Sequence, residues 1–280
     1  MKIKILGSGG GEGYPATFCT CEHCEEARKV KGKSLRSLSQ TFINDDLLID
    51  FPLDTDAHTV KYGINLGKIE NILITHAHQD HYVPITVNFR GDICAHNLKY
   101  EKIYFYGPSN LEQIYDATVS PYGIALQRRK NVGFVVMEDK KTYTVGKYQV
   151  TAINAFHAPQ LGSLNYIIEE NQKSVLYLVD SGYPTEETLA FLRGRNRVFD
   201  CVIMDGTMGV APPKTYMYHM GFQENKELKE QLLLEKIANE NTRFIVTHIT
   251  HNKAETHEKI EEIFKGSGIE VAYDGLEIEV

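Results

Sequence analysis

The stretch ITHAHQDHY (residues 74–82) places three histidines and an aspartate within six consecutive positions. It continues the apolar run KIENILIT, which predicts a short buried strand. In an extended segment the first two histidines project to the same side, and the aspartate and third histidine follow after a turn. Imidazole nitrogens and carboxylate oxygens suit zinc, manganese or iron. A polar surface loop is the alternative, but H-x-H-x-D-H after an apolar strand favours a metal site formed by His76, His78, Asp80 and His81.

The chain has 280 residues and a formal net charge of −7. It contains no internal repeat and no Pro/Ser-rich linker, so we expect a single domain spanning residues 1–280. The negative charge argues against a bulk electrostatic grip on nucleic acid, and a nucleic-acid partner is not expected. No stretch approaches the roughly 18 apolar residues of a membrane span, and MKIKILGSGG does not fit a secretory signal. We therefore expect a cytoplasmic protein without a membrane partner.

Apolar strand-like runs alternate with helical patterns along the chain. Strands dominate the first half, and strand–helix alternation dominates the second. This mixture predicts sheets in the middle and helices outside, an α/β layered sandwich. Residues 82–147 are less regular, and we expect loops or a flap over the site there. The expected strands are 3–6, 47–51, 71–75, 102–107, 148–156, 174–180, 200–205, 243–248 and 276–280, and the expected helices are 22–30, 184–194, 223–240 and 253–266.

Three of the five cysteines are packed into FCTCEHC, namely Cys19, Cys21 and Cys24. In a reducing compartment such clustered thiols indicate a metal site that lacks one ligand. A redox-active cluster is the alternative. The other two, Cys94 and Cys201, are isolated and fit ordinary small residues.

Further ligand-type side chains occur where other predicted strands end. His157 follows YQVTAINAF, Asp180 ends SVLYLVD, and His248 ends RFIVTH. Loops at strand ends, held by a rigid sheet, are where α/β proteins assemble their sites. Together with the four residues of 76–81 they make seven candidate ligands, enough for two metals that share one carboxylate.

This succession of motifs resembles the metal motifs of the metallo-β-lactamase fold hydrolases, along essentially the whole chain. The resemblance implies a four-layer αββα sandwich, and it implies that Asp50, at the end of LLIDF, supports the site from the first sheet. It assigns one metal to His76, His78 and His157, the other to Asp80, His81 and His248, and the bridging position to Asp180. Two metals about 3.5–4 Å apart can share a hydroxide nucleophile and stabilise charge on a phosphorus-bound oxygen.

The cysteine cluster narrows the resemblance to the PhnP-like cyclic phosphodiesterases. His251 lies three residues beyond His248, and with the three cysteines it would make a closed Cys₃His structural zinc site. His219 in MYHMGFQENKEL resembles the histidine that serves as general acid in that group, although a surface histidine is the alternative. Asp205 could orient His219 or the substrate, and Asp80 is assigned a catalytic role besides its metal role. The resemblance further implies a homodimer.

We therefore expect a dinuclear metal-dependent phosphodiesterase that acts on a small cyclic or linear phosphodiester. Its metals would be manganese or zinc, which mixed His/Asp ligation does not distinguish. A tRNA-processing nuclease of the same fold is one alternative, which the negative net charge of the chain disfavours. A lactamase or thioesterase would need neither the structural zinc nor His219. A non-catalytic PqqB-like accessory protein in cofactor biosynthesis is the alternative from another class, and it has no need for a complete ligand set.

Overall fold

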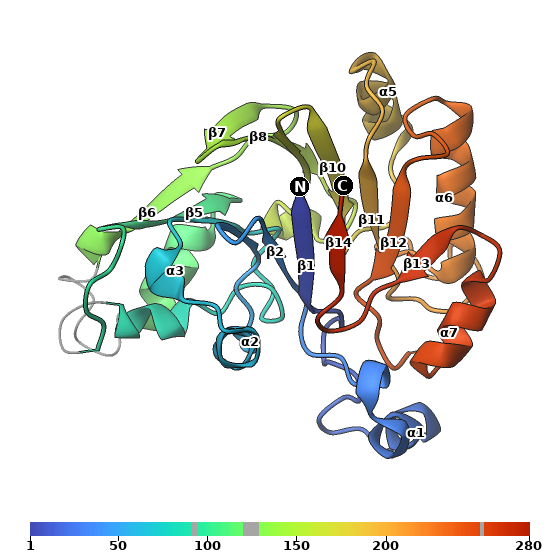
Figure 1. The fold of residues 1–280 in the computed structure, drawn as a ribbon, viewed down its shortest axis with the longest axis horizontal. Coiled ribbons are helices and arrows are strands. Elements are labelled where there is room, and N and C mark those ends of the chain that lie inside the picture. The colour runs from blue at the N-terminus through green and yellow to red at the C-terminus, as the bar shows by residue number, and fades with distance from the viewer. Residues whose placement is uncertain (91–93, 120–128, 253–254) are drawn as a thin grey trace.

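The computed structural model describes residues 1–90, 94–119, 129–252 and 255–280, and within these residues the strands form two seven-stranded sheets (Figure 1). In the first sheet the order is β14-β1-β2-β3-β4-β5-β6, and in the second it is β13-β12-β11-β10-β9-β8-β7. Both sheets mix parallel and antiparallel pairs. The strands are β1 (Lys2–Gly7), β2 (Gln40–Ile43), β3 (Leu47–Ile49), β4 (Asn71–Leu73), β5 (Ile103–Gly107), β6 (Val132–Val136), β7 (Thr142–Val145), β8 (Tyr148–Asn154), β9 (Leu164–Glu170), β10 (Lys173–Leu178), β11 (Cys201–Asp205), β12 (Arg243–Thr247), β13 (Ile269–Val271) and β14 (Glu277–Glu279).

The two sheets pack face to face, and helices cover their outer faces. Alternate residues of each strand point inward, as in Ile3 and Ile5 of β1 and Tyr166 and Ile168 of β9, and one buried apolar cluster spans both sheets. A second cluster joins the outer face of the second sheet to α5, α6 and α7, and a third joins the first sheet to α3. The expected αββα sandwich is therefore confirmed. The helices are α1 (Glu22–Val30), α2 (Thr55–Tyr62), α3 (Leu111–Val119), α5 (Glu186–Gly194), α6 (Phe222–Leu234) and α7 (His257–Phe264).

One expected helix is wrong in its extent. The pattern of 223–240 predicted a continuous helix, but α6 ends at Leu234. Lys236 adopts a left-handed backbone conformation with φ of 58°, which a continuing helix does not tolerate. The turn there directs Ile237 into the core behind the second sheet. The expected helix of 22–30 is confirmed as α1, whereas residues 253–254 of the last expected helix lie outside the described residues.

Residues 82–147 are more regular than expected. They contribute β5 and β6 to the edge of the first sheet, α3 to its outer face, and β7 to the edge of the second sheet. The expectation of a flap over the site stays a prediction, because residues 91–93 and 120–128 lie outside the described part of the chain. Within the described residues, no helix combines the length and the apolar character that crossing a membrane requires.

Truncating a buried side chain between the sheets tests this packing. Ile203 on β11 is fully buried in the central cluster, and its replacement by alanine should lower the free energy of unfolding by about 2–5 kcal/mol, because a cavity remains. Denaturant unfolding measures this loss. Leu234→Ala is the control, since Leu234 is exposed and its truncation should change stability by about 0.5 kcal/mol or less. Equal losses in the two variants would contradict the proposed core.

Candidate metal centre

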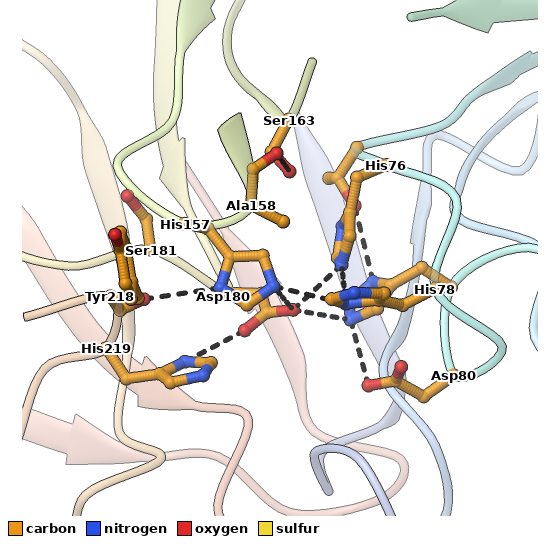
Figure 2. A network of polar contacts seen from close by, with 12 residues as sticks. His76, His78, Asp80, His157, Ala158, Ser163, Asp180, Ser181, Tyr218 and His219 are labelled. Atoms are coloured by element: carbon orange, nitrogen blue, oxygen red, sulfur yellow. Dashed lines mark hydrogen bonds and ion pairs between the residues drawn. The ribbon is translucent and has the colours of Figure 1, made fainter. Parts of the chain in front are cut away.

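Loops that leave the ends of strands in both sheets bring the predicted ligands together, and Figure 2 shows His76, His78, Asp80, His157 and Asp180 among them. The loop after β4 of the first sheet carries His76, His78, Asp80 and His81. The loops after β8, β10 and β12 of the second sheet carry His157, Asp180 and His248. Parallel strands of one sheet present their carboxyl ends at the same edge, which is why residues so far apart in the sequence converge here.

The first cluster consists of His76, His78, His157 and Asp180, whose ligand atoms all lie within 4.8 Å of one another. His76 Nε2 is 2.8 Å from His78 Nδ1, and His157 Nε2 is 3.2 Å from the same nitrogen. Asp180 Oδ2 lies 3.1 Å from His76 Nε2. Burial lowers the pKa of His157 to about 4, so its imidazole is neutral at physiological pH. Neutral imidazole nitrogens that face one another around a carboxylate are a donor set for a divalent cation.

The second cluster consists of Asp80, His81, Asp180 and His248. His81 Nε2 lies 3.2 Å from His248 Nε2 and 3.2 Å from Asp80 Oδ2. It also lies 3.2 Å from Asp180 Oδ2, the same oxygen that faces the first cluster. Burial opposes ionisation of Asp80, but His81 and His248 hold its pKa well below the usual range. Asp180 therefore belongs to both clusters and lies between them.

Hydroxyl and carboxylate groups hold the outer nitrogens of the ligand rings. Asp50 is fully buried, accepts hydrogen bonds from the Thr75 backbone N–H and hydroxyl, and its Oδ2 lies 2.7 Å from His81 Nδ1. On the other side, Thr207 Oγ1 lies 2.7 Å from His248 Nδ1 and donates to Asp205. Such contacts fix the ring so that Nε2 faces the centre. The sequence analysis predicted Asp50 at the site but did not predict Thr75 or Thr207. Threonine is common in loops, so only its position next to a candidate ligand could have indicated this role.

His219, from the loop between β11 and α6, points toward the first cluster (Figure 2). Its Nδ1 lies 2.9 Å from Asp180 Oδ1 and 3.3 Å from Asp205 Oδ2. Burial alone would lower the pKa of His219, but the contacts with Asp180 and Asp205 raise it to about 10. The structure thus brings His219 and Asp205 together beside the metal ligands. The ligand-type atoms of His219 and Asp205 also form a group with those of Asp180 and His248 that could hold a metal.

The glycine-rich segment GSGGG (residues 7–11) can approach the site closely because Gly10 has no side chain. A Cβ atom on Gly10 would lie 2.6 Å from His248 Nδ1, closer than any side chain allows. Gly10 N also donates to the carbonyl of Ile249. The segment therefore lets the backbone pass directly beside a ligand ring. It borders a cavity of about 370 Å³ whose lining includes His78, Asp80, Asp180 and His219.

The cysteine cluster lies at the N-terminal loop and is completed by His251. Cys19 Sγ and Cys21 Sγ lie 3.3 Å and 3.5 Å from His251 Nδ1, and Cys24 belongs to the same group within 4.8 Å. The hydrogen bond with His251 lowers the pKa of Cys21 to about 6, whereas burial raises that of Cys24 to about 12. Three sulfurs and one imidazole nitrogen fit a tetrahedral zinc ion. This group ties the N-terminal loop to the segment after β12.

Removing the charge of Asp50 tests its support of the second cluster. In Asp50→Asn, His81 loses the carboxylate that faces its Nδ1, so the affinity of the site for a divalent metal should fall by about 10- to 100-fold. Competition with a chromophoric chelator measures this affinity directly. Asp56→Asn, at an exposed position of α2, is the matched control and should leave the affinity unchanged. Unchanged affinity in Asp50→Asn would contradict the supporting role.

Several solved structures are similar to this chain. A structure described as a new diphosphatase from the PhnP family aligns at a TM-score of 0.74 and 20% identity, covering 100% of this chain and 97% of that one. Zn²⁺-bound PqqB from Methylobacterium extorquens aligns at a TM-score of 0.73 and 18% identity, covering 100% of both chains. Human tRNase Z, short form, aligns at a TM-score of 0.66 and 17% identity, covering 100% and 99%. At these identities the likeness shows the fold.

A search of curated proteins returns no match. The family model of the beta-lactamase superfamily domain matches residues 49–249. That span begins in β3, one residue before Asp50, and ends one residue after His248, so it includes all seven predicted ligands of the two clusters. The chain therefore belongs to the beta-lactamase superfamily and has the metallo-β-lactamase fold of metal-dependent hydrolases.

Proposed function

We propose that this protein is a dinuclear metal-dependent phosphodiesterase that acts on a small cyclic or linear phosphodiester. The observation that carries the proposal is the position of Asp180 Oδ2, 3.1 Å from His76 Nε2 in one cluster and 3.2 Å from His81 Nε2 in the other. A carboxylate shared in this way can bridge a pair of ions about 3.5–4 Å apart. His76, His78 and His157 hold one ion in this proposal, and Asp80, His81 and His248 hold the other.

When bound at these residues, two ions would supply a nucleophile drawn from water and would neutralise charge on the phosphoryl oxygens. Side chains of the protein supply the remaining roles, which are proton donation and attraction of the substrate anion. Asp180 and Asp205 hold His219 through Nδ1, which leaves Nε2 to give a proton to the departing oxygen. A charged imidazolium at that position also attracts the phosphodiester anion. Asp80 acts by holding its ion beside the cavity.

Manganese and zinc both suit the dinuclear centre, because its ligands are imidazole nitrogens and carboxylate oxygens. We propose in addition a structural zinc ion at Cys19, Cys21, Cys24 and His251. His251 Nε2 lies 2.7 Å from Glu12 Oε1, a contact that orients the ring toward the sulfurs. The wild-type chain should accordingly bind three ions.

Metal analysis of a cysteine variant tests the zinc site. Cys24→Ser should lose one equivalent of zinc per chain and keep two ions, because Cys24 belongs to the cysteine cluster and to neither of the two His/Asp clusters. Inductively coupled plasma mass spectrometry counts the ions. Cys94→Ser is the control, since Cys94 is exposed and isolated from the cluster. Three equivalents in Cys24→Ser would remove this site from the proposal.

Three alternatives share the fold. One of the similar structures is a tRNase Z, but the net charge of −7 disfavours a polyanionic substrate. Another is PqqB, and a non-catalytic role would leave His219 and the full ligand set without a purpose. A third similar structure is a diphosphatase, and a phosphoanhydride would undergo the same attack at phosphorus. Small phosphodiesters and diphosphates are therefore the substrates to test first, with neither nucleic acid nor membrane as partner.

Substitution of His219 tests the proposed general acid. His219→Ala should reduce kcat/KM by about 10²- to 10⁴-fold for a diester with an alkoxide leaving group, which needs protonation. The loss should be smaller for bis(p-nitrophenyl) phosphate, because nitrophenolate departs without a proton. Rates are measured on protein loaded separately with manganese and zinc, with His96→Ala, an exposed position, as control. Equal losses on the two substrates would instead make His219 an anion-binding group.

A further inference from the structure

A second cavity, of about 700 Å³, adjoins the proposed metal centre. It shares Gly11, Glu12 and Asp80 with the cavity that the metal ligands line. One wall is the N-terminal loop that leads into the cysteine cluster, and the other carries Leu53. We call this cavity the N-terminal groove. Gly11, Glu12 and Asp80 therefore form the border between the groove and the cavity at the metal centre.

Two large apolar side chains stand unusually exposed on the walls of this groove. Phe18 is fully exposed, and Leu53 is 67% exposed. Phe18 lies directly before Cys19, whose sulfur contacts His251, so the cysteine cluster fixes the position of this part of the wall. Singly exposed apolar side chains are common on protein surfaces, but on the walls of a cavity they are the groups that contact the apolar part of a ligand.

The charge of the groove restricts that ligand. Its lining, within the described residues, contains the carboxylates of Glu12, Asp54 and Asp80. The one guanidinium in that lining, Arg36, is buried and donates to Ser8 Oγ and the Ala272 carbonyl. A second phosphate would therefore meet repulsion without a free cation. The carboxylates disfavour a second anionic group, and Phe18 and Leu53 favour an apolar or aromatic one.

The direction of the reaction assigns the groove to one side of the substrate. His219 and Tyr216 both line the metal cavity, and neither lines the groove. Their rings stack with centroids 5.5 Å apart. The leaving group must depart beside His219. In an in-line displacement the substituent that stays on phosphorus projects sideways from the axis of attack, and the groove beside Asp80 lies on a side that His219 does not line.

We infer that the N-terminal groove binds the retained substituent of the phosphodiester, an apolar or aromatic group, and that Phe18 determines specificity for it. This inference rests on the proposed function. It narrows the substrate class to monoanionic phosphodiesters with one apolar or aromatic substituent that carries no further negative charge, and it excludes nucleic acid strands.

Two esters with the same leaving group test the inference. Bis(p-nitrophenyl) phosphate retains an aromatic group and ethyl p-nitrophenyl phosphate retains a small one, while both release nitrophenolate. Phe18→Ala should lower kcat/KM for the aromatic ester by about tenfold or more, since burial of a phenyl contact is worth at least that factor. The ethyl ester should change by less than about twofold. Leu234→Ala, which truncates an exposed side chain on α6 outside the groove, should affect neither.

The other outcomes overturn the inference in distinguishable ways. Equal losses on both esters would mean that Phe18 acts only by shaping the loop, and no loss on either would remove it from recognition. Equal losses with a smaller mass in sedimentation would make Phe18 a contact with a second copy of the chain.

A binding measurement tests the groove independently of the proposed phosphodiesterase activity. Calorimetry with diphenyl phosphate and diethyl phosphate should show tighter binding of the aromatic ligand, and Phe18→Ala should abolish that preference. Should the wild-type protein turn over neither ester, the phosphodiesterase proposal fails, whereas the binding preference still supports the groove. Equal binding of the two ligands by the wild type overturns the groove even if turnover is observed.

Discussion

One carboxylate oxygen, Oδ2 of Asp180, joins the two histidine clusters on which the site depends. It lies 3.1 Å from His76 Nε2 and 3.2 Å from His81 Nε2, two rings that follow a strand of the first sheet, while Asp180 itself follows a strand of the second. Burial opposes a charge on this group, but His248 and the contact with His219 hold the pKa of Asp180 well below the usual range. The contact therefore exists only where the two sheets are packed together, and the core between them is part of the site.

The backbone at the site is held in an unfavourable conformation by that core. Asp50, Asp180 and His248 all adopt left-handed backbone conformations, with φ of 68°, 55° and 58°. Each such residue costs roughly 1–3 kcal/mol, which persists only where the surrounding structure fixes it. Asp50 and His248 are the first residues after the buried strands β3 and β12, and Asp180 is the second residue after the buried strand β10. The turn that results directs the side chain across the sheet edge toward the centre, so the ligand geometry is set by the protein fold.

The sequence allowed the ligands to be predicted because strand ends are recognisable from short apolar runs, and the first polar side chain beyond each run reaches the same edge. His157, Asp180 and His248 were found in this way, and all three lie in the clusters. Thr75 and Thr207 were not, since their hydrogen bonds arise only once distant segments meet. The end of α6 was missed for a similar reason, because burial of Ile237 overrides the helical pattern of its sequence. The extended groove and the exposure of Phe18 depend on the arrangement of four separate chain segments, which periodicity does not encode.

The central claim is that two metal ions share Asp180, and electron paramagnetic resonance of the manganese-loaded protein tests it most directly. The cysteine cluster is first filled with zinc, which has no unpaired electrons, and manganese is then added in steps. Two Mn²⁺ ions about 3.5–4 Å apart and bridged by one carboxylate should give the spectrum of an exchange-coupled pair at two equivalents per chain. In Asp180→Ala the coupling should disappear. The spectrum of isolated Mn²⁺ at every ratio in the wild-type protein would contradict the shared centre.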